Sequence, residues 1–148
     1  MRPRTTRASG LRPLGAAILA AIVLSAPVSA STAEPVEIDL HVVFGGSETF
    51  NATGFCPSGT AVSFGFHQAG QGRATTFHLF KTLTCDDGSG TLTIRVEASL
   101  VFGTPGTIGG WSVVDGTGDY AGTRGGGMIV GTSFDGGIDD RYTGMLSS

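Results

Sequence analysis

The chain has 148 residues, of which 25 are glycine and 14% are charged, and its formal net charge is −3 at pH 7. This acidic balance argues against nucleic acid as a partner, because binding to phosphates needs a basic surface. The length is enough for one domain with a single hydrophobic core and too short for two.

Residues 1–30 have the pattern of a secretory signal peptide. Four arginines lie among the first twelve residues, an apolar segment follows at 14–23, and Val28-Ser29-Ala30 is a small-residue cleavage site. The apolar run ends before the roughly twenty residues that a transmembrane helix needs. We therefore expect a secreted domain at 31–148, extracellular or in the cell envelope, with no membrane contact after cleavage. That domain keeps five basic and all twelve acidic residues, a formal charge of −7 that also disfavours anionic membranes.

Short strands are predicted along the rest of the chain. Apolar residues alternate with other residues at 36–44, at 62–66 and most regularly at 92–102. Because alternate residues of a strand point to the same face of a sheet, each pattern predicts a strand with one buried face. In the second strand this places Val62, Phe64 and Phe66 on the buried face.

Turn sequences rich in glycine, proline and aspartate separate these strands at intervals of about ten residues. They lie at 45–46, 56–59, 86–90, 104–106 and 135–137. Short connections favour antiparallel neighbours, in either a sandwich or a barrel. We expect an all-β fold, a small closed antiparallel barrel of about eight strands, because closure leaves no sheet edge exposed to aggregation.

Cys56 and Cys85 are the only two cysteines, and both lie in the part of the chain that is expected to be exported. Disulfides persist in oxidising compartments, so we predict one bond between them. The alternative, a catalytic thiol, is less favoured because two cysteines in such a compartment more often pair.

The segment 116–121, GTGDYA, satisfies the G-x-G-x-x-A fingerprint of a dinucleotide site. Such a site needs a helix directly after the glycines. The glycines at 122 and 125–127 disfavour that helix by about 1 kcal/mol each. We interpret the motif as a turn between two strands, with Tyr120 directed inward and the later glycines permitting close strand approach. No cofactor is expected.

This region resembles the allene oxide cyclase barrel-like superfamily, which includes the dirigent proteins and small secreted actinobacterial members. The similar residues are Trp111-Ser112-Val113-Val114, the glycine-rich segments 116–122 and 124–127, and Tyr142-Thr143-Gly144. The resemblance covers 91–144 best. It implies an eight-stranded antiparallel barrel whose interior can hold an apolar small molecule. Plant members cyclise a fatty-acid epoxide or steer radical coupling, but the matching motif is the one that builds the barrel, and it does not assign their catalytic residues to positions in this chain.

Motifs for catalysis and for metal binding are missing from the sequence. There is no G-x-S-x-G elbow, and the three histidines lack the spacing of a metal site. His41 and His67 fall on the polar phase of their strands and are expected to be solvated. The acidic segment 135–140 is interpreted as a solvated turn, because its spacing matches no calcium loop. No metal is expected.

A set of aromatic and charged residues could meet at one mouth of the barrel if segments 111–130 and 141–146 pair. These candidate ligand-binding residues are Trp111, Asp119, Tyr120, Arg124, Arg141 and Tyr142. An arginine and a tyrosine beside an apolar cavity could polarise a carbonyl group. The alternative is an ordinary surface Asp–Arg pair, with Tyr120 in the core.

Two functions follow from these expectations. The first is a secreted, non-enzymatic binding or structural module, with a hydrophobic small molecule as its candidate ligand. The alternative is a cyclase or isomerase like allene oxide cyclase or the dirigent proteins, in which confinement supplies most of the catalysis. Ionisable groups facing an open apolar cavity would favour catalysis, whereas a filled interior would favour a structural role. The sequence leaves the oligomeric state open.

Overall fold

A computed structural model describes residues 32–70, 74–101 and 103–148. The expected signal peptide at 1–30 lies outside these residues. Eight strands follow one another: β1 (Glu34–Val43), β2 (Glu48–Thr53), β3 (Ser58–Ala69), β4 (Ala74–Cys85), β5 (Gly90–Val101), β6 (Gly106–Gly118), β7 (Arg124–Phe134) and β8 (Gly137–Ser147). Among the described residues no helix has the length and apolar character that a membrane crossing requires.

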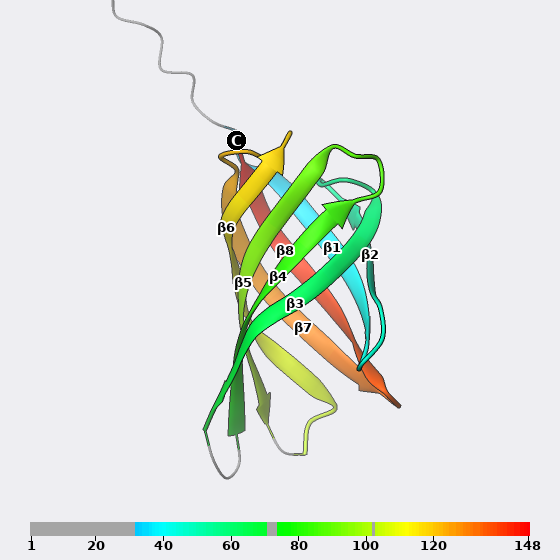
Figure 1. Cartoon of the computed structure of the whole chain (residues 1–148). Coiled ribbons are helices and arrows are strands. Elements are labelled where there is room, and N and C mark those ends of the chain that lie inside the picture. The colour runs from blue at the N-terminus through cyan, green and yellow to red at the C-terminus, as the bar shows by residue number, and fades with distance from the viewer. Residues whose placement is uncertain (1–31, 71–73, 102) are drawn as a thin grey trace, which may run out of the picture.

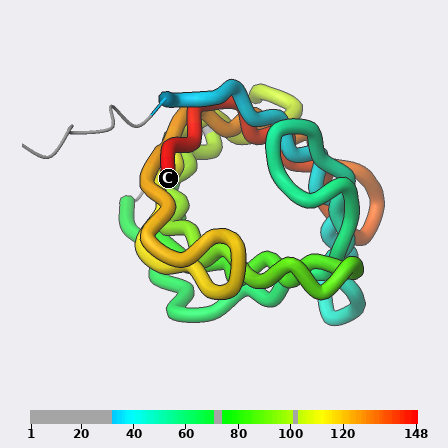
Figure 2. Tube along the Cα trace, turned by 90° about the horizontal axis from the view of Figure 1, so that it is seen from above, coloured from blue at the N-terminus to red at the C-terminus, as the bar shows by residue number. Residues whose placement is uncertain are grey.

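The strands form one closed antiparallel barrel in which each strand pairs with its neighbours in the sequence (Figure 1). Closure is made by β1 and β8, which pair from Glu34 opposite Leu146 to Val43 opposite Gly137. Figure 2, a view along the barrel, shows the chain as a continuous ring. The predicted eight-stranded barrel is therefore confirmed, and every strand has a hydrogen-bonded neighbour on both sides.

Alternate residues of the strands form the core, as the sequence pattern predicts for 36–42 and 92–98. The prediction is wrong at Phe44, which is 69% exposed, and Phe102 lies outside the described residues. Eight inward residues of β1 and β5 are buried: Val36, Ile38, Leu40, Val42, Leu92, Ile94, Val96 and Ala98. Leu100, next on the same phase of β5, is only partly buried. The same core also includes Phe50, Leu83, Trp111, Ile129 and Tyr142, from β2, β4, β6, β7 and β8.

The predicted face of β3 is wrong at Val62 and Phe64. Val62 is 64% exposed and Phe64 is 47% exposed, so both lie on the outer surface. The inward side of β3 carries the small residues Gly59, Ala61 and Ser63 instead, and Phe50 from β2 packs against the first of them. A Cβ atom added at Gly59 would lie 2.6 Å from the Phe50 ring.

A bulge later in β3 reverses this orientation. The pairing with β4 shifts register between Phe64 and His67, and Gly65 within it has a φ of +63°. Glycine adopts this left-handed conformation without a steric penalty. Within the bulge Phe66 lines the mouth of the interior cavity, but it is 64% exposed, so the expectation of a buried side chain is wrong for this residue as well.

The glycine motif is a turn between antiparallel strands, as interpreted from the sequence. Strand β6 ends at Gly118, and β7 begins at Arg124 without an intervening helix. Gly127 lies between Trp111 on β6 and Gly144 on β8. A Cβ atom added at Gly144 would be 2.9 Å from the Trp111 ring, so the glycine leaves room for the indole.

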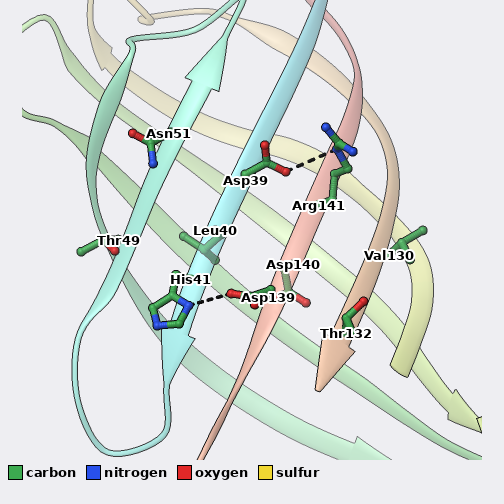
Figure 3. A pocket seen from close by; sticks show the side chains of 10 residues that line it. All are labelled: Asp39, Leu40, His41, Thr49, Asn51, Val130, Thr132, Asp139, Asp140 and Arg141. Carbon is green, nitrogen blue, oxygen red and sulfur yellow. Dashed lines mark hydrogen bonds and ion pairs between the residues drawn. The ribbon is translucent and has the colours of Figure 1, made fainter. Parts of the chain in front are cut away.

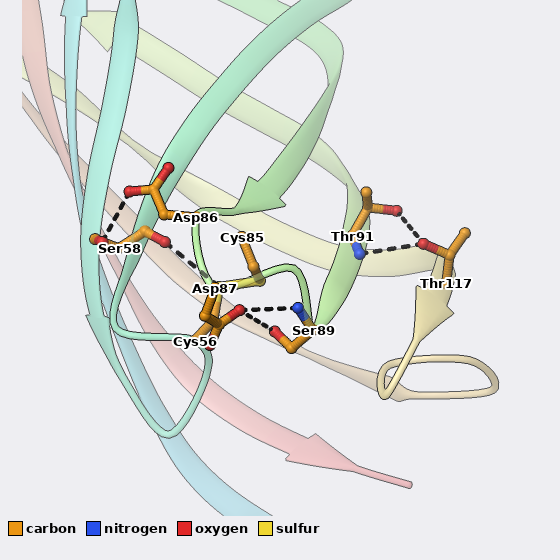
Figure 4. The surroundings of a disulfide bond; sticks show 8 residues. All are labelled: Cys56, Ser58, Cys85, Asp86, Asp87, Ser89, Thr91 and Thr117. Atoms are coloured by element: carbon orange, nitrogen blue, oxygen red, sulfur yellow. Dashed lines mark hydrogen bonds between the residues drawn. A yellow bond between two sulfur atoms is a disulfide. The ribbon is translucent and has the colours of Figure 1, made fainter.

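The predicted disulfide joins Cys56, in the turn between β2 and β3, to Cys85 at the end of β4 (Figure 4). Around it Ser58 donates a hydrogen bond to Asp86 at 2.9 Å. The backbone and hydroxyl groups of Ser89 both donate to Asp87. The bond and these contacts hold one end of the barrel together.

Candidate functional site

A cavity of about 410 Å³ opens at the end of the barrel opposite the disulfide. Its rim includes Phe44 and the glycines of the β1–β2 turn, and β3 contributes Ser63 before the bulge and Phe66 within it. Most of the wall is apolar and comes from Val42, Phe66, Phe77, Leu79, Val96, Ala98, Ile129 and Ile138. A volume of this size is within the range of small-molecule sites.

One wall of the cavity carries a buried ion pair. The Lys81 ammonium lies 2.7 Å from a Glu48 carboxylate oxygen and donates a second hydrogen bond, also of 2.7 Å, to the hydroxyl of Ser63. That hydroxyl in turn donates to Glu48 at 3.0 Å. Lys81 is only 4% exposed, so its charge is held inside the barrel by these two partners.

Strand pairing explains why these residues meet. Ser63 on β3 lies directly opposite Lys81 on β4. Glu48, at the start of β2, pairs with Ala61, and Ala61 is one inward position before Ser63. The three side chains therefore share the inner face of three adjacent strands, at the same level of the barrel.

Asp140 on β8 brings a second carboxyl group to the cavity. It is 7% exposed and accepts a hydrogen bond of 3.3 Å from the hydroxyl of the fully buried Tyr142. Burial raises the pKa of Asp140 to about 6, although the positive charge of Lys81 and the bond from Tyr142 act in the opposite direction. Burial and the nearby Asp140 also raise the pKa of Tyr142.

The pKa of Glu48 shifts in the opposite direction from that of Asp140. Burial alone would raise its pKa, but the hydrogen bonds from Lys81 and Ser63 outweigh burial and the pKa is lowered. Glu48 is therefore an ionised partner of Lys81, whereas Asp140 titrates close to neutral pH. The cavity wall therefore presents both charged and neutral hydrogen-bonding partners to a polar group of a ligand.

The six residues singled out in the sequence do not gather at one mouth. Trp111 and Tyr142 lie in the core, where the rings meet edge to face at 6.3 Å and the indole N–H donates to the Thr143 carbonyl. Asp119, Tyr120 and Arg124 lie at the disulfide end, where the Asp119 N–H donates to Ser89.

Arg141 lies on the outer wall because successive residues of a strand point to opposite faces and Tyr142 points inward. It pairs with Glu37 and, at 3.3 Å, with Asp39. Ligand contact by the six residues stays a prediction, but the cavity lies at the other end of the barrel from Tyr120 and Arg124.

The outer wall carries a shallow groove of about 490 Å³ across β1, β2, β7 and β8 (Figure 3). In it His41 contacts Asp139 at 2.6 Å, and the Arg141 side chain reaches Asp39. These side chains are more than half exposed, and exposed ion pairs contribute at most about 1 kcal/mol. In the described part of the chain, no group of three or more His, Cys, Asp or Glu residues is arranged to hold a metal ion.

Sequence reasoning missed Glu48 and Lys81, and the interpretation of 135–140 as a solvated turn is wrong for Asp140, which is buried on β8. A signal was present for two of these three residues: Lys81 is the only lysine of the chain and alternates with Leu79 and Leu83. Asp140 alternates in the same way with Ile138 and Tyr142. A charged residue on the inward phase of a strand marks a buried ionisable group.

Together these features define a class of structure, a closed eight-stranded antiparallel barrel with an apolar interior cavity and an ion pair in its wall. Comparison with protein-family models, curated proteins and solved structures found no match to the chain.

Proposed function

We propose that this protein is a secreted, non-enzymatic module that binds a small apolar molecule inside its barrel. The observation that carries the proposal is the cavity of about 410 Å³, which is lined mainly by apolar side chains and open at one end. Burial of apolar ligand surface against such walls supplies the affinity, and the few polar groups orient the ligand.

A relation to the allene oxide cyclase barrel-like superfamily is part of this proposal. It is supported by the eight antiparallel strands and by the packing of Trp111 against Gly144, which belong to the segments that resemble that group. The proposal also includes export. The protein recovered from the medium of an exporting host should begin at Ser31, and its intact mass tests this.

The binding proposal is tested by titrating the purified protein with N-phenyl-1-naphthylamine, a neutral apolar dye, and following the dye fluorescence. Replacing Ala98, a buried cavity residue, by leucine should weaken dye binding by at least about tenfold, because the added methyl groups occupy the ligand volume. The matched control is Ala121→Leu, in the exposed turn at the disulfide end.

Circular dichroism shows whether both variants keep the barrel. The proposal is contradicted if the unmodified protein gives no saturable dye response. It is equally contradicted if Ala98→Leu and Ala121→Leu bind the dye as well as the unmodified protein does.

A second candidate function is a cyclase or isomerase reaction in the same cavity. The specific observation in its favour is a carboxyl group with a pKa of about 6, Asp140, in a cavity that Lys81 also lines. A group that titrates near neutral pH is suited to general acid–base catalysis. Turnover of an unsaturated fatty-acid epoxide that is lost in Asp140→Asn, with dye binding retained, would support it. The absence of turnover would leave the binding module.

A further inference from the structure

We propose that the cavity selects apolar molecules that carry a protonated amine over molecules of the same shape that carry a carboxylate. The inference rests on the proposed binding function and adds to it the chemical class of the ligand. It is carried by the arrangement of three ionisable side chains on the cavity wall, Glu48, Lys81 and Asp140.

The positive charge of Lys81 already has a negatively charged partner, Glu48, in the cavity wall. The Lys81 ammonium is within 2.7 Å of both Glu48 and the Ser63 hydroxyl, and its side chain is 5% exposed. A ligand carboxylate would have to share this cation with Glu48. Two carboxylates around one ammonium in a poorly solvated space repel each other, so Lys81 is a poor anchor for an anionic head group.

The second carboxyl group lacks a cation of its own. Asp140 is buried, and it accepts a hydrogen bond of 3.3 Å from the neutral hydroxyl of Tyr142. Within the described part of the chain it makes no ion pair closer than 4.0 Å. When Asp140 is ionised, the three groups carry a net charge of −1, which the amine of a ligand would neutralise.

Among the residues that the structure describes, the other strands supply no further charge to the cavity. The side chains that line it from β1, β5 and β7 are apolar, and β6 contributes the neutral Thr107. Asp139, the neighbour of Asp140 on the outer wall, adds a negative charge nearby. Because Asp140 titrates at about pH 6, the preference for an amine should be strong above that pH and weaker below it.

The test uses three probes with one tail: decylamine, decanol and decanoate, each displacing the naphthylamine dye below its aggregation concentration. At pH 8 decylamine should bind at least about tenfold more tightly than decanoate, as expected for opposite charges beside a buried carboxylate. The ratio of decylamine to decanol affinity should fall several-fold between pH 8 and pH 5, because decanol does not titrate.

Two variants separate the cavity from the acidic surface. Asp140→Asn and Asp139→Asn each remove one negative charge from adjacent residues, one inside the barrel and one on the outer wall beside His41. Asp140→Asn should abolish the preference for decylamine, whereas Asp139→Asn should keep it. The pH series on the unmodified protein tests the same point if Asp140→Asn does not fold.

The inference is overturned if decanoate binds as tightly as decylamine at pH 8, or if both variants lose the preference equally. In either case dye and decanol would still bind, so the proposed function would stand. If neither the dye nor any of the three probes binds, the proposed function fails as well.

Discussion

Asp140 is a buried carboxyl group whose environment makes the folded state sensitive to pH. Its pKa is raised from 3.8 to about 6, first by burial. The folded protein therefore holds this proton more tightly than the unfolded chain does. The resulting stability is complete below about pH 4 and is lost as the pH rises through 6, by up to about 3 kcal/mol in the free energy of unfolding.

We accordingly expect Asp140→Asn to match the unmodified protein near pH 4 and to be more stable at pH 7. The asparagine cannot ionise, so it avoids the loss that Asp140 suffers between these pH values. Urea unfolding from pH 4 to pH 7 measures the difference, with the exposed Asp139→Asn as control. Equal stability of Asp140→Asn and the unmodified protein at both pH values would contradict this account.

In the described ranges of the chain, Lys81 is the only cation that forms an ion pair with Glu48. Replacing it with methionine leaves a partly buried carboxylate without its partner, and we expect a loss of about 3 kcal/mol in unfolding free energy. Adding Glu48→Gln to Lys81→Met should recover part of that loss, because the unpaired charge is removed. A double-mutant cycle by urea unfolding measures the coupling, and full additivity would argue against the ion pair.

At the scale of elements, two glycines at the connection between β6 and β7 are required for different physical reasons. Gly118 has a φ of +62°, and a Cβ atom there would lie 2.2 Å from the Ser89 carbonyl oxygen. Gly122 has a φ of +80°, but a Cβ atom there would meet nothing within 4 Å. Gly118 is required for conformation and for space, whereas Gly122 is required for conformation alone.

We therefore expect Gly122→Ala to cost about 1 kcal/mol, the penalty of a left-handed conformation for an L-residue. Gly118→Ala should cost about 3 kcal/mol, because the backbone of the β4–β5 turn must also move. Urea unfolding of both variants provides the comparison. Similar losses at the two positions would show that the close approach to Ser89 is unimportant.

At the scale of the whole molecule, the barrel has a tethered end and an open end. The Cys56–Cys85 bond closes a loop with a sequence separation of 29. Removing it by Cys56→Ser with Cys85→Ser should lower the unfolding free energy by about 3.5 kcal/mol on the chain-entropy estimate. Because the cavity is at the other end, dye affinity of the folded variant should stay unchanged. If the folded double variant bound the dye less tightly under native conditions, this would contradict the expectation that the disulfide does not affect the cavity.

The sequence by itself determined the features that depend on local patterns. Alternation placed the inward faces of β1 and β5 correctly, glycine-rich turns marked the antiparallel reversals, and the cysteine pair predicted the disulfide. These features are readable because side-chain direction in a strand repeats every two residues and turns need particular residue types.

The tertiary structure alone decided which residues share the cavity. Glu48, Lys81 and Asp140 come from β2, β4 and β8, and they meet only because β8 returns to β1 and closes the ring. Val62 and Phe64 have the same alternation as a buried face but lie outside, and the inward phase of β3 begins at Gly59, where the Phe50 ring from β2 leaves no room for a side chain. Periodicity shows that a strand has two faces, but the volumes of side chains on neighbouring strands decide which face is buried.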